Sequence, residues 1–339
     1  MFADGVETHS IDLRQNESQR WRAVIASESE SARKLFGEAA AVFERVPRLL
    51  RWAFARLYER KGGLYVDEIR AWAQGVGVQE GTVTMLNCAY ELSHLRVPKV
   101  FGCTAGVRWV EGVGMVHVRN LDWPLPGMGP ATRVFRFHDG DRDFVTIGVP
   151  GQVGVLSGMV PRGYSATINW APPVSFPTFE FGPTFLLREV LATCDTYHAA
   201  VERLRSTPLS TSVFFTVCGI EREQACIIER TANDAEIRPM RGPAIVQANH
   251  HVAERFAKNN ADILKVPEGE EEFSLDGSRV RVENLCQSLD EVTSARNLQD
   301  VAAALNASHV LNKFTVQQMI FCPAAGDLKV WRRANDASA

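Results

Sequence analysis

The feature that most constrains the fold is a change in the character of the sequence close to residue 101. Before that point the chain is rich in helix-forming residues, and after it short β-type runs recur. The later strands occur in blocks and do not alternate strictly with helices. This pattern predicts an α+β fold with a helical N-terminal segment, and it argues against a doubly wound parallel sheet.

The N-terminal segment is expected to be almost purely helical. Residues 17–60 are rich in Glu, Ala and Arg, and Pro47 should bend or break the helix within this range. Shorter helices are expected at 66–74 and 81–95. Within 41–60 an apolar face opposes a face covered by arginines, which is typical of a helix that packs on a core. A helix that lies on the surface of acyl chains has the same pattern.

Beyond residue 101 the pattern predicts strands in pairs and in a meander. Hairpins are expected at 106–110 with 114–119, at 134–137 with 144–148, and at 314–322 with 328–331. A single strand is expected at 164–170, and a meander of four strands from 212 to 248. Helices are expected at 185–205 and 292–307. Together these elements predict packed layers of sheet and helix.

Charge and composition exclude several classes of protein. The 339 residues include 37 Lys and Arg against 40 Asp and Glu, a formal net charge of -3, which argues against a nucleic-acid binder. The N-terminus lacks the basic and apolar regions of a secretory signal, and no run of about 18 apolar residues is present. The seven cysteines form no Cys-x-x-Cys pair, which argues against a disulfide framework or a zinc ribbon. We therefore expect a cytoplasmic protein with reduced thiols.

The residues most indicative of chemistry lie at the boundary between the two segments. Cys103 follows Gly102 at the start of a predicted strand, and Arg119 and Asp122 follow 16 and 19 residues later. A hairpin of this length returns Arg119 to the side of Cys103, where a guanidinium favours the thiolate. Asp122 then lies where a carboxylate accepts hydrogen bonds from an amine. The alternative is a structural ion pair on the hairpin.

These residues carry a resemblance to a known enzyme family. Cys103-Thr104, followed by the run from His117 to Trp123 (His-Val-Arg-Asn-Leu-Asp-Trp), resembles the N-terminal-nucleophile cysteine hydrolases. The similar branch is that of acid ceramidase and N-acylethanolamine-hydrolysing acid amidase, with choloylglycine hydrolases and penicillin acyltransferases as more distant relatives. Further matching segments are 11–13 with Arg20-Trp21, 87–92, 148–158 and 246–250, where Ala248 replaces the usual Thr. The resemblance spans most of the chain.

The resemblance implies a four-layer αββα sandwich and an inactive precursor that cuts itself between Gly102 and Cys103. Cleavage would give a helical chain of 102 residues and a catalytic chain of the other 237, associated as a heterodimer, with higher oligomers open. The α-amine of Cys103, with a pKa of about 8, would then act as base to its own thiol. The thiolate would attack an amide and form an acyl-thioester that water hydrolyses. This chemistry needs no cofactor and no metal.

The family pattern also implies roles for residues further along the chain. Arg119 is expected beside the sulfur, Asp122 beside the α-amine, and Asn249 as a hydrogen-bond donor to the oxyanion. A late arginine is expected in the site as well. Arg279 is the predicted residue, and Arg281 is the competing choice.

Other residues near these motifs are candidates for substrate contacts. Asn169 either contributes a hydrogen bond to the site or forms a turn at the end of its strand. His117 shares a strand face with Arg119, whereas His250 and His251 should point apart and so form no joint metal site. An acyl pocket lined by aromatic residues is predicted, with ordinary core packing as the alternative; its candidates are Trp123, Trp170, Phe176, Phe179, Phe181 and Phe185.

The sequence thus predicts an amide hydrolase that acts on a small-molecule N-acyl amide with a hydrophobic acyl group, in transient contact with a membrane surface. An acyltransferase, in which an amine replaces water, is the alternative within the enzymes. Bile-acid conjugates, acyl-homoserine lactones and β-lactams are alternative substrates. An uncleaved, non-catalytic binding protein on the same scaffold is the alternative from a different class.

Overall fold

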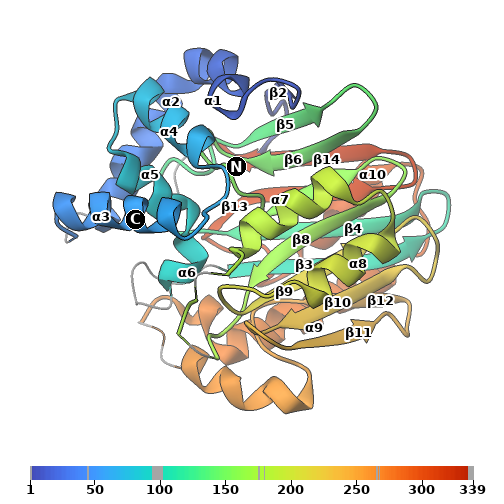
Figure 1. The fold of residues 1–339 in the computed structure, drawn as a ribbon. Helices are drawn as coiled ribbons and strands as arrows, with labels where there is room; N and C mark the ends of the chain where they lie inside the picture. The colour runs from blue at the N-terminus through green and yellow to red at the C-terminus, as the bar shows by residue number, and fades with distance from the viewer. Residues whose placement is uncertain are drawn as a thin grey trace.

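Two β-sheets lie face to face at the centre of the fold, and helices cover both outer faces (Figure 1). The computed structural model describes residues 2–43, 46–93, 102–174, 176–178, 180–264, 266 and 268–334. The six-stranded sheet has the order β1-β14-β13-β4-β3-β12, and the eight-stranded sheet has the order β11-β10-β9-β8-β7-β6-β5-β2. The predicted four-layer αββα sandwich is therefore confirmed.

The strands of each sheet come from widely separated parts of the chain. The six-stranded sheet contains β1 (Phe2–Ala3), β3 (Gly102–Val110), β4 (Gly114–Asp122), β12 (Ala244–Gln247), β13 (Thr315–Cys322) and β14 (Asp327–Arg333). The eight-stranded sheet contains β2 (Thr8–Asp12), β5 (Arg133–His138), β6 (Asp143–Gly148), β7 (Ser157–Val160), β8 (Tyr164–Trp170), β9 (Val213–Cys218), β10 (Ala225–Arg230) and β11 (Ala235–Pro239).

Each sheet is covered by its own set of helices. In Figure 1, α7 (Pro183–Thr193) and α8 (Tyr197–Ser206) cross the front of the eight-stranded sheet. On the other side α9 (Leu275–Glu291), α10 (Leu298–Val301) and the 3₁₀ helix η3 (Ala302–Asn306) pack on the six-stranded sheet. Two further 3₁₀ helices, η1 (Glu254–Leu264) and η2 (Glu271–Phe273), precede α9.

Apolar side chains from both sheets fill the space between them. One cluster joins Met115 of the six-stranded sheet to Phe214 and Ile227 of the eight-stranded sheet. A second cluster joins Val145 to Met319 and Phe321. Because these side chains are excluded from water on both faces, the two sheets hold the site described below in a rigid frame.

The N-terminal segment packs at one end of the sheets, in blue and cyan at the left of Figure 1. Its helices are α1 (Glu17–Arg20), α2 (Arg22–Phe43), α3 (Arg48–Arg60), α4 (Val66–Val76), α5 (Glu80–Asn87) and α6 (Ala89–Ser93). The predicted break at Pro47 is confirmed, because Pro47 caps the N-terminus of α3. Residues 44 and 45, between α2 and α3, lie outside the described residues. Phe101, near which the change in sequence character was predicted, also lies outside them.

The expectation of a purely helical N-terminal segment is wrong in one respect. β1 pairs with β14 in one sheet, and β2 runs parallel to β5 in the other. These strands are only two and five residues long, and their partners follow more than a hundred residues later. Edge strands this short leave little periodicity in the sequence, so only the tertiary pairing identifies them.

Three further predictions of secondary structure need correction. The meander ends at β11, because β12 crosses to the other sheet and pairs with β3. The predicted helix at 185–205 is divided into α7 and α8, and the predicted helix at 81–95 into α5 and α6. The predicted helix at 292–307 contains only α10 and η3, whereas the long helix of this region is α9, which Ser274 caps.

A buried ion pair joins the N-terminal segment to the outer helix of the eight-stranded sheet. Glu68 on α4 accepts hydrogen bonds from Nη1 and Nη2 of Arg188 on α7, at 2.5 and 2.7 Å. Arg20 and the indole of Trp21 donate to the same carboxylate, at 3.0 and 2.5 Å. Removing one partner of such a pair leaves a buried charge uncompensated, so this cluster ties the two segments together.

Within the described residues, every helix is too short or too polar to cross a membrane.

Candidate active site

The thiol of Cys103 lies on β3 beside the guanidinium of Arg119 on β4. The two strands pair antiparallel, with Cys103 opposite Leu121 and Ala105 opposite Arg119. Cys103 and Arg119 are therefore diagonal neighbours on one face of the sheet. Nη2 of Arg119 donates to Sγ of Cys103 at 3.1 Å, and both side chains are fully buried. The contact therefore places a positively charged group against the sulfur.

The guanidinium of Arg119 is held in place by the neighbouring sheet. It donates to the carbonyl oxygens of Leu156 and Ile168, at 2.6 and 2.5 Å, and to the hydroxyl of Ser157. Ile168 belongs to β8 of the eight-stranded sheet, so these bonds cross between the two sheets. Because these contacts orient the guanidinium, its position beside the sulfur is set before any substrate arrives.

The side-chain amide of Asn249 binds the backbone on both sides of the site. Its Oδ1 accepts the backbone N–H of Cys103 at 3.0 Å and Nη2 of Arg281 at 2.9 Å. Its Nδ2 donates to the carbonyl oxygen of Trp170 at 2.9 Å. Asn249 thus holds the nitrogen of the bond between Gly102 and Cys103. The predicted donation to an oxyanion would require Nδ2 to exchange its present partner, Trp170.

Of the two candidate arginines, Arg281 lies beside Cys103, and the prediction that Arg279 does so is wrong. Arg281 is 1% exposed, and its Nη1 donates to the carbonyl of Cys103 at 3.1 Å and to Oγ1 of Thr104 at 3.2 Å. Arg279 pairs with Asp276 at 3.6 Å, and its side chain is 55% exposed. Both arginines lie on α9, but they are two residues apart and so point to different sides of the helix.

Asp122 is fully buried and pairs with Arg281. Its Oδ2 accepts Nη1 of Arg281 at 3.2 Å, and its Oδ1 accepts the hydroxyl of Thr315 at 2.7 Å. Burial lowers the pKa of Arg281, and the negative charge of Asp122 opposes this effect. The nitrogen of Cys103 is bound by Asn249, so the expected contact of Asp122 with this nitrogen is not the one found.

Gly102 lies where two side chains approach the backbone closely. A Cβ atom at this position would lie 2.5 Å from Cε1 of Phe273 and 3.0 Å from Cβ of Asp122. Because a side chain here would displace either neighbour, the residue before Cys103 has room only for glycine.

One further residue of this site comes from the N-terminal segment. Tyr90, on α6, is 2% exposed. Burial raises the pKa of its hydroxyl well above the usual value, and hydrogen bonding to Cys103 contributes to the shift. Sequence reasoning grouped Tyr90 with a matching motif but assigned it no contact. The N-terminal segment thus contributes a side chain next to Cys103.

The other candidate contacts have structural partners. Nδ2 of Asn169 donates to the carbonyls of Gln247 and Ala248, at 2.9 and 3.0 Å, and so shapes the backbone that leads to Asn249. Trp170 is 8% exposed, and its indole donates to Ser93 at 3.0 Å. Trp123 is half-buried and packs against the main core.

The histidines near the motifs lie outside the cluster around Cys103. His117 is buried between the sheets and bonds to Ser165 and Thr167, and burial lowers its pKa to about 3. The rings of His250 and His251 face different partners, Ser278 and Glu229 respectively. The two rings therefore point to different positions, in agreement with the prediction that adjacent residues point apart.

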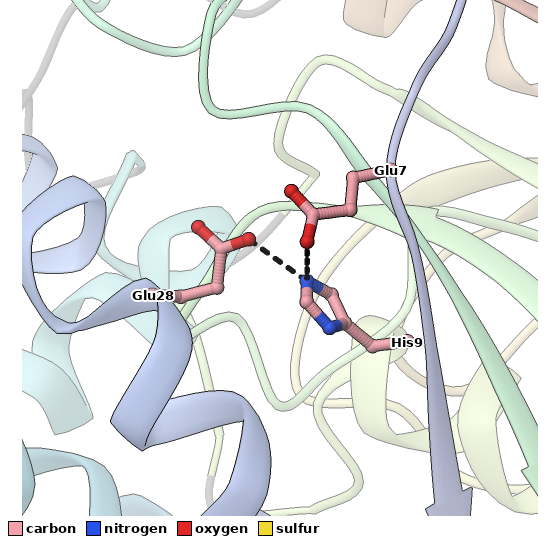
Figure 2. Close-up of side chains that lie close together, drawn as sticks. All are labelled: Glu7, His9 and Glu28. Carbon is pink, nitrogen blue, oxygen red and sulfur yellow. Dashed lines mark hydrogen bonds and ion pairs between the residues drawn. The ribbon is translucent and has the colours of Figure 1, made fainter.

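Three carboxylate and imidazole groups converge elsewhere, near the start of the chain. Nε2 of His9 lies 2.8 Å from Oε1 of Glu28 and 3.9 Å from Oε1 of Glu7. Figure 2 shows how the three side chains point toward one another. Arg133 also donates to both oxygens of Glu28, at 2.5 and 2.9 Å. Since a guanidinium already neutralises Glu28, this cluster is an ion-pair network that links β2, α2 and β5.

An apolar cavity of about 500 Å³ lies between the N-terminal segment and the α7 region. Phe54 and Tyr58 of α3, the predicted Phe176 and Phe181, and Phe185 of α7 line it. Phe179 falls outside the described residues, and Trp123 and Trp170 are not among the described lining residues. A mostly apolar cavity with few polar groups is the usual form of a site for an apolar ligand.

The spacing of buried residues on α9 explains why Arg281, the competing choice, lies in the site. Ser278, Arg281 and Leu285 are buried and lie three or four residues apart on α9. This spacing marks the inner face of a helix, and Arg279 lies off that face. Because no helix was predicted at 275–291, its phase could not be used to choose between the two arginines.

Comparisons with known proteins agree with this architecture. Residues 109–315, more than half of the chain, match the family described as acyl-coenzyme A:6-aminopenicillanic acid acyl-transferase. The chain is 25% identical over 245 residues to the N-acylethanolamine-hydrolyzing acid amidase of Caenorhabditis elegans. The matched stretch covers 66% of this chain and 66% of the relative. It is 23% identical over 282 residues to the acid ceramidase of Mus musculus, which covers 72% of this chain and 70% of the relative.

A solved structure is also similar. The ortholog of N-acylethanolamine-hydrolyzing acid amidase from Caenorhabditis elegans superposes with a TM-score of 0.53 at 20% identity, covering 68% of this chain and all of that one. At this level of identity the superposition shows a shared fold. The resemblance inferred from the motifs around Cys103 is therefore confirmed at the level of family and fold.

Proposed function

The chain belongs to the family described as acyl-coenzyme A:6-aminopenicillanic acid acyl-transferase, and we propose that it hydrolyses N-acyl amides with Cys103 as the nucleophile. The observation that carries this proposal is the contact of 3.1 Å between Arg119 and the sulfur of Cys103. The similarity to an amidase and a ceramidase supports the class of reaction.

The first step of the proposal is self-cleavage between Gly102 and Cys103. Sγ of Cys103 attacks the carbonyl carbon of Gly102, the C–N bond breaks, and the thiol proton moves to the departing nitrogen. Water then hydrolyses the thioester to a carboxylate on Gly102, and Cys103 keeps a free α-amine. The hydrogen bond from this nitrogen to Asn249 supports the step, because it orients the peptide bond that breaks.

The second step is turnover of an external amide. The α-amine takes the thiol proton, Sγ attacks the substrate carbonyl, and the protonated amine returns a proton to the leaving nitrogen. Water hydrolyses the acyl-thioester and releases the acid. Arg119 stabilises the thiolate, and Asn249 serves the oxyanion once its amide is released from Trp170.

The two products of cleavage would remain together as a heterodimer of residues 1–102 and 103–339. Three observations support this association. β1 and β2 extend a sheet each, the ion pair of Glu68 and Arg188 spans the two parts, and Tyr90 lies next to Cys103. Loss of the smaller chain would therefore expose sheet edges and remove a side chain from the site.

Acyl transfer is the second candidate function, because the matching family is described as an acyl-transferase. Both reactions share the acyl-thioester and differ only in whether water or an amine accepts the acyl group. Adding hydroxylamine to the assay distinguishes them. A transferase forms hydroxamate in preference to free acid, whereas a hydrolase continues to release mostly acid.

Contact with a membrane surface is part of the proposal and rests on α3. Leu49, Leu50 and Trp52 are 70%, 56% and 52% exposed, and arginines flank them on the same helix. A helix with this pattern binds at the interface of anionic bilayers. Replacing the three residues with Ser should reduce sedimentation with anionic vesicles several-fold without slowing hydrolysis of a short, water-soluble amide.

The experiment that tests the proposed function compares the wild-type chain with Cys103→Ala. Wild type should resolve into two bands on a denaturing gel and release amine from fatty-acyl ethanolamides, ceramides or other acyl amides. Cys103→Ala should give a single band and no release. Cys226→Ala, which alters another buried cysteine, is the matched control and should process normally. Full cleavage or full turnover by Cys103→Ala would disprove the assignment of the nucleophile.

A further inference from the structure

A half-buried glutamate lies in the wall of the apolar cavity. Glu91, on α6, lines this cavity together with aromatic side chains. Its Oε1 accepts the hydroxyl of Ser210 at 3.2 Å. Its Oε2 is shielded from solvent and has no hydrogen-bond partner among the described residues. In the wall of an apolar cavity, a shielded oxygen without a partner can be satisfied by a polar group of a ligand that enters the cavity.

The neighbouring backbone makes room for this carboxyl group. Gly182, which caps the N-terminus of α7, has no side chain, and a Cβ atom there would lie 2.5 Å from Oε1 of Glu91. Glu91 therefore lies against the start of an 11-residue helix, where the helix dipole favours a negative group. Two neighbours thus fix the position of the carboxyl group. Ser210 donates a hydrogen bond to it, and Gly182 leaves the space that it occupies.

The cavity lies on the far side of α6 from the nucleophile. Cys88, Glu91 and Leu92 line the cavity, whereas Tyr90 contacts Cys103. Tyr90 and Glu91 are consecutive residues of this short helix, so the contact to Cys103 and the carboxyl group in the cavity wall lie within one helical turn. The cavity is therefore adjacent to the proposed reaction centre.

The state of the carboxyl group narrows the chemistry of the ligand. Burial raises the pKa of Glu91 to about 7, so both its neutral and its ionised forms are present near neutral pH. A hydroxyl group can donate to the ionised form and accept from the neutral form. An ammonium group complements only the ionised form, and a plain alkyl chain complements neither and would leave Oε2 unpaired.

We propose that the cavity binds an apolar chain bearing a hydroxyl group, with the hydroxyl hydrogen-bonded to Oε2 of Glu91. The inference rests on the proposed function and narrows its substrates to hydroxylated N-acyl amides. The hydroxyl belongs either to the acyl half or to a long-chain amine half of the substrate. The chemistry at Glu91 is the same in both cases.

The test measures binding in the Cys103→Ala background, so that no turnover occurs. Two matched pairs of probes are titrated by calorimetry: N-methylhexadecanamide and N-acetylhexadecylamine, each with and without a hydroxyl on the long chain. We expect at least one hydroxylated probe to bind about 10-fold more tightly than its plain partner, since a site with a buried polar group discriminates against a ligand that leaves it unpaired. The pair that shows the preference identifies the half that carries the hydroxyl.

Two variants tie that preference to Glu91. Glu91→Leu should reduce the ratio of affinities to about one, and Gly182→Ala should reduce it by pushing the carboxyl group away, should the first variant fail to fold. Glu202→Leu is the control, because Glu202 is an exposed glutamate on α8 that is not among the described lining residues, and it should keep the full ratio. Equal affinities within both pairs, or an unchanged ratio in the folded Glu91 and Gly182 variants, would overturn the inference.

Hydrolysis is measured separately, on the wild-type chain with the same four probes. If no probe is hydrolysed while the binding preference persists, the proposed function fails and the specificity of the cavity stands. If plain and hydroxylated amides are hydrolysed equally and bind equally, the proposed function stands and the inference fails.

Discussion

The polar groups around Cys103 and the carboxyl group of Glu91, across α6, differ in how many of their hydrogen bonds are satisfied within the protein. Around Cys103, Asp122 accepts hydrogen bonds from both Arg281 and Thr315, and Asn249 is bonded through both ends of its amide. Across the helix, Glu91 has Ser210 as its only hydrogen-bond partner within the described residues, and one oxygen is left over.

This difference distinguishes a reaction centre from a binding position. Around Cys103 opposite charges are paired with each other, although Nε of Arg119 and Nε of Arg281 have no partner among the described residues. Such pairing keeps the geometry the same before and after a ligand arrives, which is what electrostatic stabilisation of a transition state needs. A carboxyl group with an unpaired oxygen in an apolar wall can form a hydrogen bond with a ligand that it lacks in the free protein.

The largest effect is expected at Arg281. Arg281→Met removes a buried cation from Asp122 and should lower the free energy of unfolding by about 3–5 kcal/mol. Arg281→Lys keeps the charge but cannot bond Cys103, Asp122 and Asn249 together, and should slow self-cleavage by about 100-fold or more. Denaturant unfolding and a time course on denaturing gels measure the two effects.

Arg279→Met is the matched control for these variants, because Arg279 is on the same helix but exposed. It should change stability by no more than about 0.5 kcal/mol and leave cleavage unaffected. If the variants at both positions behaved alike, Arg281 would have no special part in the site.

The second effect concerns the ion pair that joins the two segments. Glu68→Gln leaves the buried guanidinium of Arg188 without its counter-charge, and we expect a loss of about 3 kcal/mol in stability. In the cleaved protein the same change should weaken the association of the two chains, which size-exclusion chromatography at low concentration detects. Glu59→Gln, at an exposed ion pair with Arg56 on α3, should leave the association unchanged. If the two chains stayed associated to the same extent in both variants, the ion pair of Glu68 and Arg188 would have no part in holding them together.

The smallest effect is a pH dependence that arises from Glu91. Because its pKa is raised to about 7 in the folded chain, the folded state binds more protons than the unfolded state as pH rises from about 5 toward 7. The wild type should therefore lose stability over this range relative to Glu91→Gln, by about 2 kcal/mol between pH 5 and pH 8. Urea unfolding at several pH values measures the difference. A difference that stays constant with pH would show that Glu91 is not held in a desolvated position.

Local patterns were sufficient for much of the fold and for the centre of the site. The hairpins at 106–119 and 134–148 were predicted from alternating residues and turn glycines, and both form. The spacing of Cys103, Arg119 and Asp122 predicted a cluster because a hairpin returns the chain at a known distance. The structure brings these three residues and Asn249 together, while their roles in catalysis stay predictions.

The remaining features depend on contacts between distant parts of the chain. β2 is defined by its partner β5, and β12 by its crossing to the six-stranded sheet, so neither assignment follows from local periodicity. Tyr90 contacts Cys103 from the N-terminal segment across a stretch that includes undescribed residues. Arg281 required the phase of a helix that the sequence reasoning had not recognised.

By itself the sequence determined the change from helix to strand near residue 101, the nucleophile motif at that boundary and the family to which the chain belongs. These features are local, because they depend on residue type and on short spacings along the backbone. Only the tertiary structure decided which arginine completes the site and that Glu91 keeps an unpaired oxygen in an apolar cavity. Burial and pairing depend on which distant segments pack together, and the packing of α6 and α9 against the sheets supplies both.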